Sequence, residues 1–133
     1  MGMRSVVKWT LSMTPDRLKP YREERPWGDF IEFTKDQRST VKIVTVKKGE
    51  ALSLQSHQKR DEFWHVIDGS GWVIVGNVRS AARPDDEFFV PRGTKHRLEG
   101  GSEDISVLEL SFGEFDESDI VRFEDKYGRA RPS

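Results

Sequence analysis

The chain has 133 residues, of which 34% are charged and 35% hydrophobic, and its formal net charge is −1. A chain of this length suits one domain that buries a core without covalent cross-links. The near-neutral charge argues against a nucleic-acid or membrane-surface binder, which usually carries a basic excess. The absence of cysteine excludes disulfides, thiolate nucleophiles, Cys-rich zinc sites and iron–sulfur clusters.

The first segment, residues 1–24, is expected to be an arm that leads into a domain spanning residues 25–133. Three prolines in "TPDRLKPYREERP" mean that any helix there is short. The opening "MGMRSVVKWTLSM" is too short and too polar in its apolar stretch for a signal peptide, and no window has the apolar length of a membrane span. A cytoplasmic location is therefore expected.

From Trp27 onward, short β-type segments alternate with turn residues. In chain order they are "TVKIVTV" (40–46), "LSLQSH" (52–57), "FWHVI" (63–67), "WVIV" (72–75), "EFFVP" (87–91) and "ISVLELSF" (105–112). "DGSG" and "EGGSED" are interpreted as breaks between strands. This spacing predicts an all-β double-sheet jelly roll or related barrel. Only the tail, "DESDIVRFEDKYGR" (116–129), is expected to hold a helical turn, with Ile120, Val121 and Phe123 partly buried.

A polar run, "QSHQKRDE" (55–62), interrupts two of these apolar segments. Residues two apart in a strand face the same side, so Gln55 and His57 can both point into a barrel. A turn over residues 58–61 would bring Glu62 back on the neighbouring strand, opposite that pair. The three side chains are therefore candidate metal ligands.

The same alternation places Trp64 and Val66 on the face of Glu62 and turns His65 the other way, so His65 is interpreted as structural. A second segment, "PRGTKH" (91–96), sets His96 after a Pro–Gly turn, from which a strand could bring it into the same barrel mouth. A single histidine is more often a surface or packed residue than a ligand. Two separate segments that point to one site strengthen the metal interpretation.

These stretches resemble the two cupin motifs. "GEALSLQSHQKRDEFWHVIDGSG" (49–71) is similar to the first motif, with Gln55 where most cupins have a histidine, and "PRGTKH" is similar to the second, Pro-x-Gly-x-x-His. "RPWGDF" (25–30) and the tail "FGEFDESDIVRFEDKYGR" (112–129) are more specific. Together they resemble type II phosphomannose isomerases, the cupins that also form the C-terminal domain of bifunctional mannose-1-phosphate guanylyltransferase/mannose-6-phosphate isomerase enzymes.

The resemblance implies a cupin double-stranded β-helix, or jelly-roll barrel, that interconverts mannose 6-phosphate and fructose 6-phosphate. It implies one divalent metal ion held by Gln55, His57, Glu62 and His96. Zinc is the first expectation for this nitrogen and oxygen donor set, with manganese, cobalt, nickel and iron as alternatives. The expected partners are a small sugar phosphate and a second copy in a homodimer, with neither nucleic acid nor membrane.

The implied enediol chemistry needs a proton carrier and a phosphate anchor. Lys95, beside His96, and Lys59, in the mouth turn, are the candidate acid/base groups, although alternation points Lys95 away from the face of His96. Arg60 and Arg129 are the candidate phosphate anchors. From spacing alone both arginines would be surface residues, but the resemblance implies that Arg129 reaches back to the active site. Lys95 and Arg129 are therefore predicted to be catalytic, and Arg60 and Lys59 to bind substrate.

The chain departs from the family where a His-rich run reads His57, Gln58, Lys59. This leaves the predicted ligands in place but leaves the substrate open. The alternative prediction is a non-catalytic cupin that binds a sugar or sugar phosphate, and a third is another metal-dependent cupin enzyme, such as a dioxygenase. No Gly-rich nucleotide-binding segment precedes Arg25, so nucleotidyl transfer is not expected.

Overall fold

The computed structural model describes residues 7–8 and 20–129, which form strands and no helix. No helix in this part of the chain could therefore cross a membrane. The strands are β1 (Val7–Lys8), β2 (Tyr21–Arg25), β3 (Gly28–Glu32), β4 (Ser39–Val46), β5 (Leu54–Ser56), β6 (Arg60–Val75), β7 (Val78–Ala82), β8 (Glu87–Val90), β9 (His96–Gly113) and β10 (Val121–Glu124).

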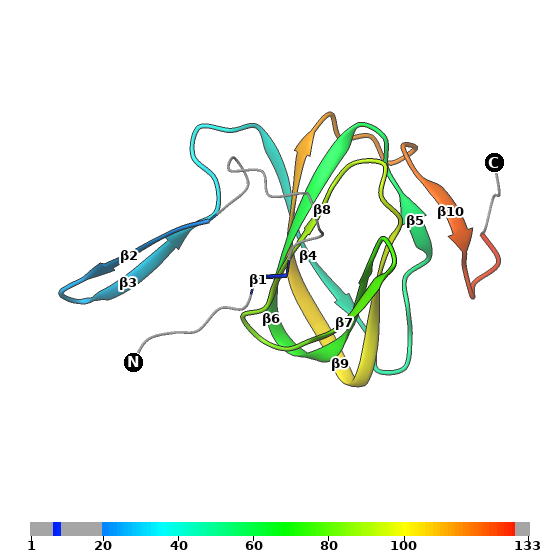
Figure 1. The fold of residues 1–133 in the computed structure, drawn as a ribbon, viewed down its shortest axis with the longest axis horizontal. Helices are drawn as coiled ribbons and strands as arrows, with labels where there is room; N and C mark the ends of the chain where they lie inside the picture. The colour runs from blue at the N-terminus through cyan, green and yellow to red at the C-terminus, as the bar shows by residue number, and fades with distance from the viewer. Residues whose placement is uncertain (1–6, 9–19, 130–133) are drawn as a thin grey trace.

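Two long strands, β6 and β9, organise the barrel (Figure 1). They pair antiparallel from Arg60↔Gly113 to Val75↔His96 and bend together midway. Before the bend β6 pairs with β8, and the matching part of β9 pairs with β4. Beyond it β6 pairs with β7, and β9 pairs with β5, which in turn pairs with β10. The one eight-stranded sheet therefore folds over into two facing layers, which confirms the predicted double-sheet barrel.

Glycines make the bend possible. Gly69 has a φ of +83°, and a Cβ built on it would lie 1.8 Å from the carbonyl oxygen of Asp104. A Cβ on Gly71 would lie 2.0 Å from the carbonyl oxygen of Glu99. The backbones are therefore too close for any side chain at these positions. The prediction that "DGSG" and "EGGSED" end strands is wrong, because both are bends inside continuous strands.

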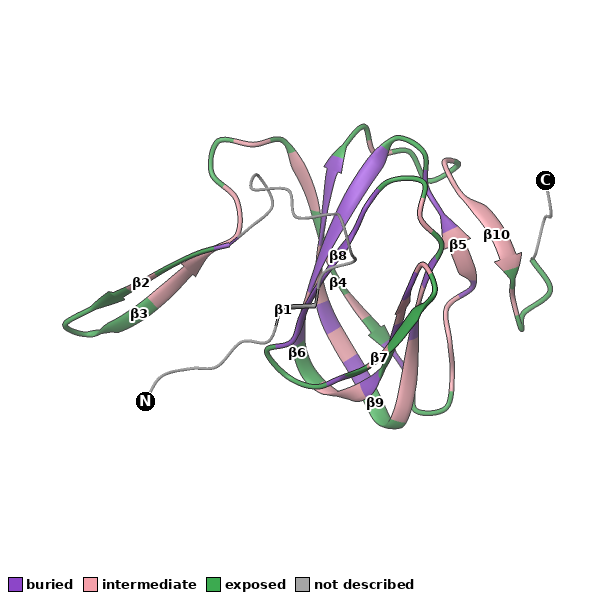
Figure 2. Ribbon diagram, in the orientation of Figure 1, coloured by how far each residue is buried: buried purple, intermediate pink, exposed green. Residues whose placement is uncertain are grey.

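Strand alternation divides the buried apolar side chains into an inner cluster, which includes Trp64, and an outer cluster, which includes Phe63. Buried residues are concentrated on the central strands β6, β8 and β9 (Figure 2). Trp64 and Val66 belong to the inner core, as predicted from the alternation of β6. His65 faces outward, where its ring lies 5.3 Å from that of Phe33 and its Nδ1 lies 2.7 Å from Glu87 Oε2. The inner core consists of Val46, Trp64, Val66, Val73, Val75, Ala82, Phe88, Val90, Leu98, Ile105 and Val107. The interpretation of His65 as structural is consistent with these contacts.

The tail forms a strand and not the helical turn that we predicted. β10 pairs antiparallel with β5, with Val121 opposite Ser56 and Arg122 opposite Gln55. Ile120, Val121 and Phe123 are half-buried, as expected. The cause of the error is long-range pairing with β5, which local helical spacing cannot reveal.

A hairpin of β2 and β3 extends away from the barrel (Figure 1). Arg22 ties it to the barrel, because its Nη2 donates to Glu87 Oε2 at 2.7 Å. The predicted boundary between residues 24 and 25 falls inside this hairpin. Most of the predicted arm lies outside the described residues, so the division into arm and domain stays a prediction.

Candidate metal centre

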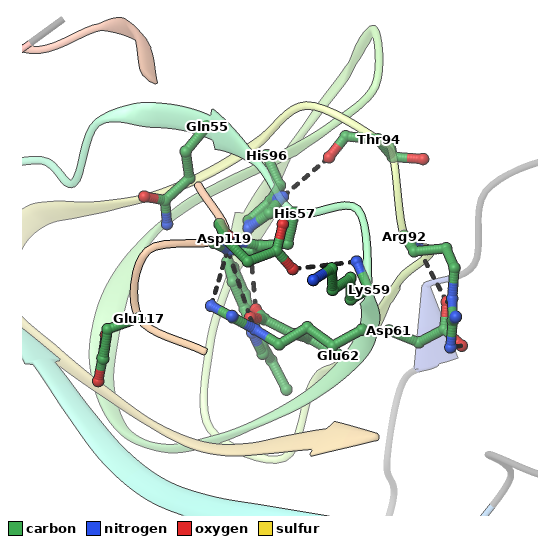
Figure 3. A network of polar contacts seen from close by, with 12 residues as sticks. Gln55, His57, Lys59, Asp61, Glu62, Arg92, Thr94, His96, Glu117 and Asp119 are labelled. Carbon is green, nitrogen blue, oxygen red and sulfur yellow. Dashed lines mark hydrogen bonds and ion pairs between the residues drawn. The ribbon is translucent and has the colours of Figure 1, made fainter. Parts of the chain in front are cut away.

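Three buried side chains meet inside one end of the barrel (Figure 3). His57, Glu62 and His96 each offer one ligand atom, and these atoms all lie within 4.8 Å of one another. His57 follows β5 and His96 begins β9 in one layer of the bent sheet, whereas Glu62 lies on β6 in the facing layer, where β6 pairs with β8. β5 and β6 are not neighbours, because β9 lies between them. The expected turn onto an adjacent strand is therefore wrong, and the side chains meet across the interior instead.

Backbone carbonyls fix how the two imidazoles are turned. His57 Nδ1–H donates to the carbonyl of Asp119 at 2.7 Å, and His96 Nδ1–H donates to that of Thr94 at 2.9 Å. Each Nε2 therefore carries the lone pair and faces the interior. Burial lowers the pKa of both histidines, which favours these neutral forms.

His96 Nε2 is buried and has no hydrogen-bond partner among the described residues. It lies 3.8 Å from Glu62 Oε1. A buried nitrogen lone pair without a partner is costly unless a ligand takes it. Two neutral imidazoles and a carboxylate are a donor set that suits a divalent transition metal. The group could therefore hold a metal ion.

Glu62 is held by hydrogen bonds on both oxygens. Oε1 accepts from Trp64 Nε1 at 3.0 Å, and Oε2 accepts from Arg60 Nε at 3.1 Å. Burial alone would raise the pKa of Glu62, but His96, His57 and Arg60 together hold it below its ordinary value. The carboxylate is thus kept ionised and fixed in direction, as a metal ligand requires.

Gln55 lies at the edge of this group. It is the cross-strand partner of His96, so both side chains share a face of the sheet. Its Oε1 accepts a hydrogen bond from Ser53 Oγ at 2.9 Å, and Figure 3 shows its amide to one side of the imidazoles. Gln55 as a fourth ligand stays a prediction.

Arg60 lies inside the group, although we expected it at a solvent-facing turn. Its side chain is 7% exposed, and Nη2 donates to His57 Nε2 at 3.2 Å. Nη1 donates to the carbonyl of Asp116 at 3.2 Å, and the guanidinium stacks 4.4 Å from the centre of the Phe115 ring. Its role as a phosphate anchor stays a prediction.

The other predicted site residues, Lys59, Lys95 and Arg129, are exposed and lie outside the buried group. Lys59 is exposed, and its Nζ lies 3.8 Å from Glu114 Oε2. Lys95 is exposed on the turn before β9, with Nζ 4.3 Å from the centre of the Phe123 ring. Arg129 Nε donates to Asp125 Oδ2 at 2.7 Å, at the far end of β10 from His57. The described contacts do not bring Lys95 or Arg129 to the three ligands.

Sequence reasoning missed Glu109, a second carboxyl group beside Glu62. It lies on β9 and is hydrogen-bonded to Glu62. Burial and the charge of Glu62 raise the pKa of Glu109 to about 8. The signal was present in "ISVLELSF", because alternation from the buried Ile105 and Val107 puts Glu109 on the inner face.

Asp119 was also missed. Besides its carbonyl bond to His57, its carboxylate accepts from the backbone N–H groups of Gln58 and Lys59 at 2.9 and 3.0 Å. One tail residue therefore shapes the loop between His57 and Glu62 and orients a candidate ligand. No local pattern could show this, because the two segments lie about 60 residues apart.

Comparison with known proteins identifies the family of the chain. Residues 17–125 match the family described as mannose-6-phosphate isomerase C-terminal. The chain is 37% identical over 107 residues to the mannose-1-phosphate guanylyltransferase ManC of Salmonella typhimurium, covering 79% of this chain and 22% of that protein. It is 38% identical over 130 residues to a mannose-1-phosphate guanylyltransferase of Klebsiella pneumoniae, covering 96% and 28%. The chain thus spans about a quarter of the length of these relatives.

Solved structures establish the fold. A cupin protein from Bacteroides fragilis superposes with a TM-score of 0.53 at 16% identity, covering 61% of this chain and 75% of that one. The dTDP-6-deoxy-D-glucose-3,5-epimerase RmlC of Legionella pneumophila gives 0.61 at 13% identity, covering 77% and 69%. With the cupin double-stranded β-helix and the match over residues 17–125, the chain belongs to the mannose-6-phosphate isomerase C-terminal family.

Proposed function

We propose that this chain is a metal-dependent sugar-phosphate isomerase that interconverts mannose 6-phosphate and fructose 6-phosphate by enediol proton transfer. The observation that carries the proposal is the buried group of His57, Glu62 and His96, with the unpartnered Nε2 of His96, in a member of this family. A polar centre of this kind inside an apolar barrel is costly to build unless it binds something.

The three side chains would hold a divalent metal ion, with Gln55 as the proposed fourth ligand, and the bound ion would polarise the sugar oxygens as a Lewis acid. Other residues of the chain orient the proposed ligands and set their charge. The carbonyls of Asp119 and Thr94 keep both Nε2 lone pairs directed inward. Glu109 keeps a proton beside Glu62, so that the interior does not hold two adjacent carboxylates.

The proton carrier and the phosphate anchor are proposed among the basic residues named from the sequence. Lys59 lies in the loop between His57 and Glu62, and its exposed contact with Glu114 can exchange for an anionic substrate. Arg129 and Lys95 would take part only if the tail moved, because they contact Asp125 and Phe123.

A coupled assay tests the proposal. The purified chain is treated with a chelator, reloaded separately with zinc, manganese, cobalt or nickel, and assayed for fructose 6-phosphate formed from mannose 6-phosphate. We expect at least one metal to restore turnover, and His96→Ala to lower kcat/KM by roughly 100-fold or more. His65→Gln is the matched control, because the replacement amide can still donate to Glu87 outside the barrel.

Absence of turnover with all four metals would refute the isomerase. If the metal-loaded chain then still bound mannose 6-phosphate in calorimetry, the non-catalytic sugar-phosphate-binding cupin would be the correct function. Normal turnover by a folded His96→Ala variant would refute the ligand assignment itself.

A further inference from the structure

A buried arginine occupies the space between the candidate ligands. Arg60 directs Nη2 at His57 Nε2 and Nε at Glu62 Oε2, at 3.2 and 3.1 Å. Its side chain is 7% exposed, and that of Glu62 is 2% exposed. A guanidinium is always charged and only donates hydrogen bonds, so it balances a carboxylate that would otherwise be buried without a counter-ion.

The hydrogen bond to His57 is incompatible with metal binding at the same nitrogen. Since Nδ1–H donates to the carbonyl of Asp119, His57 has one lone pair left, on Nε2. Arg60 uses that lone pair in the structure. A metal ion bound by His57 would need the same pair of electrons, because Nδ1 is already committed. Arg60 and a metal ion therefore exclude each other at Nε2.

We propose that Arg60 is an internal competitor that holds His57 and Glu62 in place without metal and leaves His57 when an ion binds. The proposal rests on the metal-binding part of the proposed function and not on the isomerase reaction. A guanidinium beside a divalent cation is also repelled, so the two positive charges add to the exclusion. Arg60 stabilises the metal-free barrel and lowers its affinity for metal.

Removal of the guanidinium should therefore change affinity and stability in opposite directions. We expect Arg60→Met to tighten cobalt binding by about tenfold or more, measured by titration of the chelated chain and followed by the visible cobalt bands. The same variant should have a lower Tm in chelator than the wild type, because Glu62 loses its buried counter-ion.

Lys59→Met is the matched control. It removes one positive charge from the adjacent residue, whose Nζ is exposed and 3.8 Å from Glu114. Its cobalt affinity should change by less than about threefold. If the folded Arg60→Met variant bound cobalt no more tightly than Lys59→Met, the competition would be refuted.

Two further measurements keep the test decisive. Arg60→Lys keeps the positive charge but loses the guanidinium that donates to both His57 and Glu62. It should therefore also tighten cobalt binding. An unchanged cobalt affinity in this folded variant would count against the proposal. In ¹⁵N spectra of the wild type, the guanidinium signal of Arg60 should shift when zinc is added to the chelated chain. Failure of every variant to bind cobalt would overturn the metal site and the proposed function together, whereas equal binding by all of them would overturn only the role of Arg60.

Discussion

Glu62 and Glu109 place two carboxyl groups side by side in the barrel, and the pKa values of these two groups are shifted in opposite directions. Neighbouring histidines and Arg60 keep the pKa of Glu62 low despite burial. Burial and the charge of Glu62 raise the pKa of Glu109 from 4.5 to about 8. In the folded chain at neutral pH one of the two carboxyl groups is therefore protonated, as adjacent carboxyl groups generally require.

This arrangement predicts that the metal-free chain loses stability between pH 6.5 and about 8. Glu109 keeps its proton in the folded state and loses it in the unfolded state, so the folded state binds more protons in this window and its stability falls as pH rises. The slope is up to roughly 1.4 kcal/mol per pH unit. The pKa values of the buried histidines are lowered from 6.5, so their contribution to stability rises with pH. This contribution opposes the trend only below pH 6.5.

Urea denaturation in chelator at several pH values measures the slope. Glu109→Gln should flatten it, because the amide has no proton to lose. Glu103→Gln, which changes an exposed carboxyl group on the same strand, serves as the control for the change in charge. The same slope in the wild type and in Glu109→Gln would show that another group is responsible.

Alternation predicts the faces of β6 correctly, but β6 begins earlier in the chain than the sequence predicts. Trp64, Val66 and Glu62 point inward as expected, since burial of one face fixes the register. Arg60 is on the same face by the same rule, because β6 begins at Arg60 and not after the turn that the sequence predicts over residues 58–61. Polar residues at a strand end carry no local signal that distinguishes a turn from a buried ion pair.

At the scale of elements, the continuous bent strands were the feature least visible in the sequence. Gly69 and Gly71 look like turn residues, and only contact with the backbone of β9 shows that they are bends. The pairing of β10 with β5 and the placement of β9 between β5 and β6 are also long-range. Composition and spacing therefore predicted the fold class and the number of candidate ligand segments, but not which strands are neighbours.

The bend itself can be tested with Gly69→Ala. A methyl group there would lie 1.8 Å from the carbonyl oxygen of Asp104, and φ is +83°. We expect a loss of roughly 3 kcal/mol or more in the free energy of unfolding, from the left-handed conformation and the clash together. Gly76→Ala is the matched control, because Gly76 has a φ of +62° but its nearest neighbour is 3.8 Å away. Its expected loss is about 1 kcal/mol. Equal losses in urea denaturation would show that the close approach costs nothing.

At the scale of the whole molecule, the candidate ligands join the two layers of the folded sheet. His57 and His96 belong to the layer that contains β5, and Glu62 comes from the layer that contains β8. An ion held by all three would link the two layers at one end of the barrel, where Arg60 of β6 also reaches across to His57. Metal binding should therefore stabilise the fold as a unit and not only one loop.

Zinc should raise the Tm of the chelated chain by an amount that grows with the logarithm of the ratio of free zinc to its Kd. With free zinc at about 100 times its Kd, binding to the folded state adds about 2.7 kcal/mol, which corresponds to a shift of roughly 8–12 °C for a chain of this length. Differential scanning calorimetry measures the shift. Magnesium is the control ion, because a site with two imidazoles does not suit it. His96→Ala is the control variant, since it removes the unpartnered nitrogen. A zinc shift that persisted undiminished in this variant, or that magnesium reproduced, would place the stabilising ion elsewhere on the molecule.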